Sequence, residues 1–347
     1  MRLLLTFAVI AAAGVGLYFL VSGGGTTHAL PAADDWVVST PGREGFSAPR
    51  FQRAIRKIEQ RDASLLALLV VRHGRLVLEH YYHGYARTSG FDVYSVTKSV
   101  TSALVGRAIA EHRLDGVHET LGKIFGNLAP PRARRITIQQ LLTMTSGWPG
   151  DADPRNDIGE SQNITRALLN RPIVARPGTA FRYDTSSSHL LSAVLTRALG
   201  MSERDYAQRW LLGPMHIPLA DDWPADNRGN TFGGTGLTLF ARDATKLGLL
   251  YLHHGRWKGR QLIPAAWVAT STRTHVRVNK FNGYGYDWWT ERKGSLDAFF
   301  AYGYGGQVVA VVPKLDLVVT FFSATIGERP RVDDIVFSKI VPTITRR

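Results

Sequence analysis

Tyr94-Ser-Val-Thr-Lys-Ser-Val-Thr-Ser-Ala-Leu-Val-Gly-Arg-Ala-Ile-Ala110 is the stretch of this chain that predicts most about its fold. Its apolar residues recur at steps of three and four, the period of a helix with one buried face. These residues are Val96, Val100, Ala103, Leu104 and Ala108. The pattern predicts a helix that continues to about His112. Ser95 stands at or just before its first turn, where unpaired backbone N–H groups and the helix dipole favour developing negative charge.

Lys98 follows Ser95 by three positions, so the two side chains share one face of this helix. A hydroxyl at a helix N-terminus with an amine beside it is the Ser-x-x-Lys arrangement of an acylating serine. At average residue usage such a pair arises by chance about once in a chain of this length. The spacing alone therefore indicates a candidate nucleophile without establishing one.

Composition narrows the class of protein. The chain has 347 residues, of which 44% are hydrophobic and 20% charged, as in a globular protein. Its net charge is +14, but the basic residues are scattered and form no recognisable nucleic-acid module. An anionic membrane surface or envelope polymer explains the charge as well as nucleic acid would, and no nucleic-acid binding is expected. There is no cysteine and no His-Glu-x-x-His motif, so we expect no disulfide, no metal site and no cofactor.

The N-terminal segment, residues 1–22, is predicted to be a membrane anchor. Leu3–Val21 carries no charge and would span about 28 Å as a helix, close to the thickness of a bilayer's hydrocarbon core. Arg2 precedes this run, and the first charges after it are acidic, which predicts a bacterial inner-membrane protein whose body lies in the periplasm.

Two alternatives stay open for that segment. It could be a signal peptide cleaved after Ala29 or Ala33, which would release the protein into the periplasm or the medium. It could also be a buried soluble helix. In each case residues 23–45 are predicted to form a flexible linker, and residues 46–347 a single catalytic domain. The oligomeric state cannot be inferred.

Periodicity and turn residues predict the remaining elements. Besides the Ser95 helix, helices are predicted at 49–61, 135–143, 164–169, 243–253, from Pro264 onward and at 331–344. A further helix is predicted to carry Leu190–Leu199, to begin at one of the N-cap candidates Asp184, Thr185 and Ser186, and to end at Gly200. Strands are predicted at 65–71, 76–82, 283–290, 298–302, 308–312 and 317–322. Residues 213–238 are rich in Gly, Pro, Asp and Asn and are predicted to form a long surface loop. Tyr183 directly precedes three good N-cap residues and is therefore expected just outside a helix N-terminus.

Four motifs in a fixed order resemble those of a known family. They are Tyr94-Ser95-Val96-Thr97-Lys98, the segment from Ile136 to Gly147, Pro177-Gly178-Thr-Ala-Phe181-Arg-Tyr183, and Gly305-Gly306-Gln307 before an apolar strand. The chain resembles the penicillin-recognising serine hydrolases from about Phe46 to its C-terminus. Within that family it is most similar to the branch near class C β-lactamases that includes esterases and 6-aminohexanoate-dimer hydrolases.

The resemblance implies a fold of the α/β (α+β) class, with an antiparallel sheet of about five strands flanked by helices, beside an all-helical lobe. The site would lie between the two parts. By the same resemblance Ser95 is the nucleophile, Lys98 its hydrogen-bonded partner and Tyr183 the general base or its relay. The backbone N–H groups of Ser95 and Tyr304 form the oxyanion hole.

Two departures from the family pattern bear on the substrate. Thr185 stands where an Asn amide usually binds the substrate, and Ala301-Tyr302-Gly303 replaces the usual Lys-Thr-Gly. Without that Lys, an anionic substrate terminus loses its obvious partner, so Thr185, Tyr302 and Gly303 are expected to contact neutral acyl groups. Six aromatic residues could line an apolar pocket, although core packing is the commoner role for most of them: Trp148, Tyr284, Trp288, Trp289, Tyr302 and Tyr304.

These features together predict a serine hydrolase that cleaves esters or small amides through an acyl-enzyme on Ser95. A D-alanyl-D-alanine peptidase or β-lactamase is the first alternative, disfavoured by the missing Lys. The second is a non-catalytic envelope-binding protein on the same scaffold, disfavoured because Ser95, Lys98 and Tyr183 are all present. The substrate is expected to be a small ester or amide or a component of the cell envelope.

Overall fold

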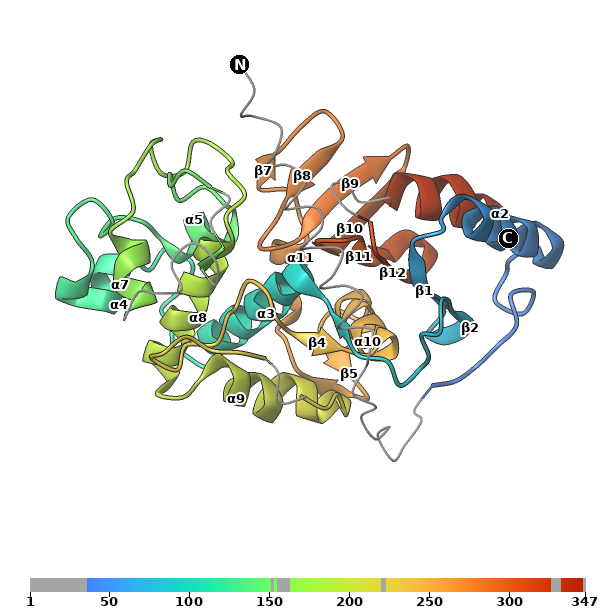
Figure 1. The fold of residues 1–347 in the computed structure, drawn as a ribbon, viewed down its shortest axis with the longest axis horizontal. Helices are drawn as coiled ribbons and strands as arrows, with labels where there is room; N and C mark the ends of the chain where they lie inside the picture. The colour runs from blue at the N-terminus through green and yellow to red at the C-terminus, as the bar shows by residue number, and fades with distance from the viewer. Residues whose placement is uncertain (1–35, 151–152, 155–162, 220–222, 326–331, 346–347) are drawn as a thin grey trace, which may run out of the picture.

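A computed structural model describes residues 36–150, 153–154, 163–219, 223–325 and 332–345. Its centre is an eight-stranded antiparallel sheet with strand order β2-β1-β12-β11-β10-β9-β8-β7 (Figure 1). The strands are β1 (Leu65–Arg72), β2 (Arg75–Tyr81), β7 (Val276–Arg277), β8 (Asn282–Tyr284), β9 (Trp289–Lys293), β10 (Leu296–Gly303), β11 (Gln307–Val312) and β12 (Leu317–Ser323). Because β1 pairs with β12, the two ends of the domain complete one sheet.

The predicted fold class is confirmed, but the predicted number of strands was too low. Short strands β7 and β8 extend the sheet beyond β9, which accounts for part of the difference. The predicted strand at 283–290 is wrong: β8 and β9 form a hairpin whose tip is Gly285–Trp288. The tip turns sharply because Asp287 adopts a φ of 56°, and because Gly285 passes so close to Ser271 that a Cβ would lie 2.0 Å from its carbonyl oxygen. Two further two-stranded sheets are β3 (Phe91–Asp92) with β4 (Thr238–Leu239), and β5 (Arg256–Trp257) with β6 (Arg260–Gln261).

The central strands are buried on both faces, which explains their continuous apolar sequences. In β1, Leu68 and Val70 pack into one core, whereas Leu69 and Val71 pack into the other. Strands β11 and β12 alternate in the same way. The β1–β2 hairpin turns at His73-Gly74, where both residues have positive φ.

One face of the sheet is covered by the two ends of the domain. Helix α2 (Ala48–Arg61) lies beside the C-terminal π-helix η6 (Asp333–Ile340), as Figure 1 shows. Phe51, Ile55 and Ile58 of α2 are buried there, at the spacing of one helix face. The predicted closing helix is confirmed over 333–340 and is followed by a single 3₁₀ turn, η7 (Val341–Thr343).

The other face carries α10 (Ala241–Leu252), then α3 (Thr97–Ala110), and beyond α3 the helical lobe (Figure 1). The remaining helices are α4 (Leu121–Phe125), α5 (Ile138–Leu142), α7 (Ile164–Leu169), α8 (Thr185–Leu199), α9 (Glu203–Ala207) and α11 (Ala265–Ser271), with short turns η1 (Tyr94–Val96), η2 (Gly126–Leu128), η3 (Gln208–Leu212), η4 (Gly213–Met215) and η5 (Pro313–Leu315). The all-helical lobe predicted by resemblance is therefore present.

Helix α3 differs from its prediction in one respect. Instead of one buried face it is buried almost all round, from Thr97 to Gly106, because it runs between the sheet and the helical lobe. Gly106 permits this, since a Cβ there would lie 2.2 Å from the ring of Trp267. Its buried hydroxyl groups bind carbonyl oxygens of the β8–β9 hairpin tip: Ser99 donates to Asp287 and Ser102 donates to Tyr286.

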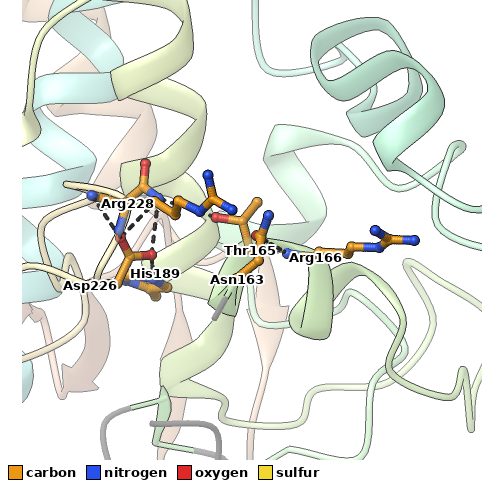
Figure 2. Close-up of polar contacts among 7 residues, drawn as sticks. Asn163, Thr165, Arg166, His189, Asp226 and Arg228 are labelled. Atoms are coloured by element: carbon orange, nitrogen blue, oxygen red, sulfur yellow. Dashed lines mark hydrogen bonds and ion pairs between the residues drawn. The ribbon is translucent and has the colours of Figure 1, made fainter. Parts of the chain in front are cut away.

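The predicted surface loop at 213–238 is wrong for its second half. Residues 230–237 are buried, and Figure 2 shows how the preceding turn is attached to the helical lobe. The Asp226 carboxylate accepts hydrogen bonds from the backbone N–H groups of Arg228 and Asn230 and lies 3.3 Å from His189 Nε2 on α8. Asn230 also donates to Thr165 on α7. The polar side chains Asp226 and Asn230 of this segment therefore form buried hydrogen bonds instead of facing solvent.

Among the described residues, no helix is both long and apolar enough to cross a membrane. The anchor predicted over Leu3–Val21 lies outside those residues, so the anchor and the periplasmic location stay predictions.

Candidate active site

Ser95 lies in the 3₁₀ turn η1 (Tyr94–Val96), directly before α3, rather than in the first turn of the helix itself. The Lys98 Nζ atom is 2.8 Å from Ser95 Oγ, so the predicted pair is formed. Lys98 is only 1% exposed. A lysine buried in contact with a serine hydroxyl is a plausible arrangement for nucleophile activation.

The backbone before Ser95 is strained. Tyr94 has a φ of 47°, a left-handed conformation that costs a non-glycine residue about 1 kcal/mol or more. Two hydrogen bonds hold it: Asp92 Oδ1 accepts from the Tyr94 N–H at 2.8 Å, and the Thr97 hydroxyl donates to the Tyr94 carbonyl at 2.5 Å. Strain of this kind is concentrated at functional sites, where it fixes the direction of a reactive side chain.

Two further oxygen atoms surround the Lys98 amine. Thr185 Oγ1, at the start of α8, is 3.2 Å from Nζ, and the Gly234 carbonyl oxygen is 2.7 Å away. Gly234 can come this close only without a side chain, since a Cβ would lie 2.7 Å from Thr185 Cγ2. Thr185 therefore contacts Lys98 itself, a position not predicted from the sequence. Gly234 was missed, although adjacent glycines in a polar segment indicate a close backbone approach.

Tyr183 is brought to the same place. Its ring lies against Lys98, with Nζ 5.1 Å from the ring centroid, and it stacks on Trp289 at 5.9 Å. Tyr284 meets it edge-on at 6.3 Å. Tyr183 comes just before Asp184, the N-cap residue of α8, whose carboxylate binds Arg171 and Ser187. Tyr183, which is distant in the sequence, thus lies beside the Ser95–Lys98 pair.

The end of β10 approaches η1 on the other side of Ser95. A Cβ on Gly303 would lie 2.2 Å from the Val93 carbonyl oxygen, so this approach requires glycine. The rings of Tyr94 and Tyr304 are 5.7 Å apart, and Tyr304 is 46% exposed. Tyr302 is half-buried. These positions suit the oxyanion role of the Ser95 and Tyr304 N–H groups, which stays a prediction.

The aromatic residues named from the sequence divide into two groups. Tyr284 and Trp289 contact Tyr183 directly. Trp148 is 1% exposed and packs beneath the guanidinium of Arg171, and Trp288 is buried against Tyr251 and Phe299. A substrate contact by Trp148 stays a prediction.

Two buried carboxyl groups near the site were missed because nothing in their sequence context indicates burial. Asp287, at the hairpin tip, has a pKa well above its usual range because burial disfavours the anion, although Lys98 opposes the shift. Burial raises the pKa of Glu203, at the start of α9, to about 7. The described residues contain no group of three or more His, Asp or Glu side chains that could hold a metal ion.

Comparison with known proteins agrees with this geometry. The family model Beta-lactamase matches residues 51–337. Protein flp from Staphylococcus aureus (strain COL) is 26% identical over 167 residues, which cover 44% of this chain and 33% of that protein. The chain thus matches about a third of the length of that relative.

Two further similarities cover more of both proteins. The 6-aminohexanoate-dimer hydrolase of Paenarthrobacter ureafaciens is 22% identical over 286 residues, covering 74% of this chain and 72% of the relative. The solved structure described as EstCE1, a hydrolase with promiscuous acyltransferase activity, superposes with a TM-score of 0.69 at 19% identity, covering 84% of this chain and 98% of that one. Since the family model spans most of the chain, the resemblance inferred from its motifs is confirmed: the chain belongs to the Beta-lactamase family of serine hydrolases.

Proposed function

We propose that this protein hydrolyses esters or small amides through an acyl-enzyme on Ser95. The observation that carries the proposal is the 2.8 Å contact between Lys98 Nζ and Ser95 Oγ, with the Tyr183 ring against the same amine. The relatives named as a 6-aminohexanoate-dimer hydrolase and as the hydrolase EstCE1 support an amide or ester substrate.

The surroundings of Lys98 explain how the serine is activated. As an ammonium, Nζ has three protons that it can donate to Thr185 Oγ1, the Gly234 carbonyl and Ser95 Oγ. As a neutral amine it keeps two donors for Thr185 and Gly234, and its lone pair faces Ser95. Thr185 and Gly234 therefore orient the amine so that it can accept the Ser95 proton, directly or with Tyr183 as relay.

The reaction then follows in two steps. Ser95 Oγ bonds to the substrate carbonyl carbon as its proton passes to the Lys98–Tyr183 pair, and the N–H groups of Ser95 and Tyr304 stabilise the oxyanion. Collapse breaks the bond to the alcohol or amine, which leaves with that proton. Water, deprotonated by the same pair, then attacks the acyl carbon, the bond between that carbon and Ser95 Oγ breaks, and the pair returns the proton to Oγ as the acid product leaves. A positioned base contributes roughly 10²–10⁴-fold to the rate.

The substrate is proposed to be neutral at the position where a peptidyl-D-alanine or a penicillin carries its carboxylate. Ala301 and Tyr302 supply no cation where the family pattern has Lys, and Ala301 is buried in the core. Tyr284 and Trp289 beside Tyr183 favour apolar groups. A peptidyl-D-alanine or penicillin carboxylate would lack its bidentate or ionic partner there.

The test treats the purified protein with a fluorophosphonate, with a fluorescent penicillin and with p-nitrophenyl esters. Fluorophosphonate labelling and ester turnover are expected, and Ser95→Ala should abolish both, a loss of at least about 10³-fold. Ser295→Ala, at an exposed turn, is the matched control and should leave both unchanged. Penicillin labelling of Ser95 would favour the peptidase or β-lactamase alternative, and no reaction with any probe would favour the non-catalytic alternative.

A further inference from the structure

The hydroxyl of Thr101, one turn beyond Lys98 on α3, bridges two oxygen atoms. Its Oγ1 lies 2.6 Å from the Gly233 carbonyl oxygen and 2.6 Å from Glu203 Oε1. Both distances are at the short end of the range for O–H···O hydrogen bonds. Thr101 and Glu203 are both fully buried, at 0% exposure.

The number of available protons determines which atom donates in each of these two contacts. A threonine hydroxyl has one proton and can donate only once, whereas a backbone carbonyl can only accept. The Gly233 carbonyl must therefore accept the proton of Thr101. The contact between Thr101 Oγ1 and Glu203 Oε1 then requires a proton from Glu203, and only the carboxylic acid form of Glu203 carries one.

The rest of the environment also favours the neutral acid. Glu203 Oε2 makes no hydrogen bond of good geometry within the described residues, although the nearby Ser192 hydroxyl partly opposes the rise of the pKa. Gly233 leaves this oxygen room, since a Cβ there would lie 2.7 Å from it. A buried anion with an unpaired oxygen is costly. The Asp287 carboxyl of the hairpin tip interacts with Glu203 by charge repulsion, and Lys98 lies on the preceding turn of α3, although it makes no contact with Glu203 that contributes to the pKa of this carboxyl. Burial raises the pKa of Glu203 to about 7.

The bridge connects Glu203 to the catalytic lysine through two consecutive glycines. Thr101 holds the carbonyl of Gly233, and the next carbonyl, that of Gly234, accepts from Lys98 Nζ. Movement of the Gly233 carbonyl would therefore displace an acceptor that orients Lys98. The segment has little freedom otherwise, because a Cβ on Gly234 would lie 2.8 Å from the Thr185 carbonyl oxygen.

We propose that Glu203 is a positioning residue, held as the neutral acid, which donates to Thr101 and through Gly233-Gly234 fixes Lys98 beside Ser95. The effect on Lys98 and Ser95 rests on the hydrolase function proposed above, whereas the protonation of Glu203 does not. When Glu203 loses its proton, no proton remains for the contact between Thr101 Oγ1 and Glu203 Oε1 while Thr101 donates to Gly233. Either the Gly233 carbonyl or the Glu203 carboxylate must then move away from Thr101. The orientation of Lys98 weakens as a consequence.

The test compares the wild type with Glu203→Gln, whose amide can donate to Thr101 at every pH. The rate of fluorophosphonate labelling of Ser95 is measured on both sides of about pH 7. The ratio of the variant's rate to that of the wild type is expected to rise by about tenfold with increasing pH, because only the wild type loses the donor. Equal pH profiles would overturn the positioning role. Asp297→Asn, an exposed carboxyl on β10, is the control and should leave the profile unchanged.

A second measurement does not depend on activity. Infrared difference spectra between the wild type and Glu203→Gln should contain the C=O stretch of a protonated carboxyl group below about pH 7 and lose it above. Absence of that band would overturn the proposal even if the enzyme is active. If no probe labels the wild type, the hydrolase function fails, while the infrared band still decides the protonation of Glu203. Thr101→Ser, which keeps the hydroxyl, should retain the band and the pH profile even if Glu203→Gln folds poorly.

Discussion

The two faces of the central sheet differ in the kinds of residues that are buried against them. On the side of α2 and η6, apolar residues such as Phe51, Phe300 and Ile335 form a buried cluster, and the buried carboxylate Asp62 lies at its edge, as the C-cap of α2. On the side of α3, the core also contains Lys98, Glu203 and Asp287, all buried. Burying polar and ionisable groups costs stability unless they are paired. The comparison indicates that one side mainly stabilises the fold, whereas the other gives up stability to hold reactive groups.

The largest expected effect on stability lies on the apolar side. Phe51→Ala should lower the free energy of unfolding by about 3–5 kcal/mol, because the ring is 2% exposed and its removal leaves a cavity between α2 and the sheet. The kcat of the molecules that remain folded should not change. Denaturant unfolding and active-site titration check this, with Gln52→Ala at the neighbouring exposed position as the control. A large drop in kcat would contradict the separation of the two sides.

The next effect concerns the polar side and its pH dependence. The pKa of Glu203 is raised from 4.5 to about 7 in the folded protein, so the folded state binds more protons than the unfolded chain between these pH values. Its contribution to stability should therefore fall as pH rises from about 4.5 to about 7 and stay constant above, on the order of 3 kcal/mol in all. Chemical denaturation of the wild type and of Glu203→Gln across this range measures it. A wild-type minus variant difference that does not change with pH would contradict the buried acid.

The smallest of the three effects is local to the oxyanion site. Gly303→Ala should lower kcat/KM about 100-fold, roughly 2.7 kcal/mol, because its Cβ would push β10 away from Val93 and displace the Tyr304 N–H from Ser95. Most of the stability should remain, since the apolar side is untouched. Gly42→Ala is a suitable control, because a Cβ there meets nothing within 4 Å. Unchanged kcat/KM in Gly303→Ala would remove Tyr304 from the proposed oxyanion hole.

Much of the fold could be predicted because its signals are local. The apolar runs of β1 and β12, the His73-Gly74 turn and the spacing of Phe51, Ile55 and Ile58 each require only neighbouring residues. The predictions that failed depend on distant partners. The β8–β9 hairpin is tight because Gly285 packs against the Ser271 carbonyl and Ser99 of α3 donates a hydrogen bond to the Asp287 carbonyl. No pattern within residues 283–290 indicates these distant partners. Residues 230–237 are polar enough to suggest a surface loop, yet they lie in the core.

The sequence by itself determined the order of the motifs, and with them the family and the three residues proposed for catalysis. Only the tertiary structure decided what surrounds Lys98, because its partners Thr185 and Gly234 are 87 and 136 residues away. The same holds for Glu203, whose sequence neighbours resemble those of an ordinary exposed helix start. The physical reason is that burial and proton sharing are properties of contacts between segments, whereas periodicity and capping act within one segment.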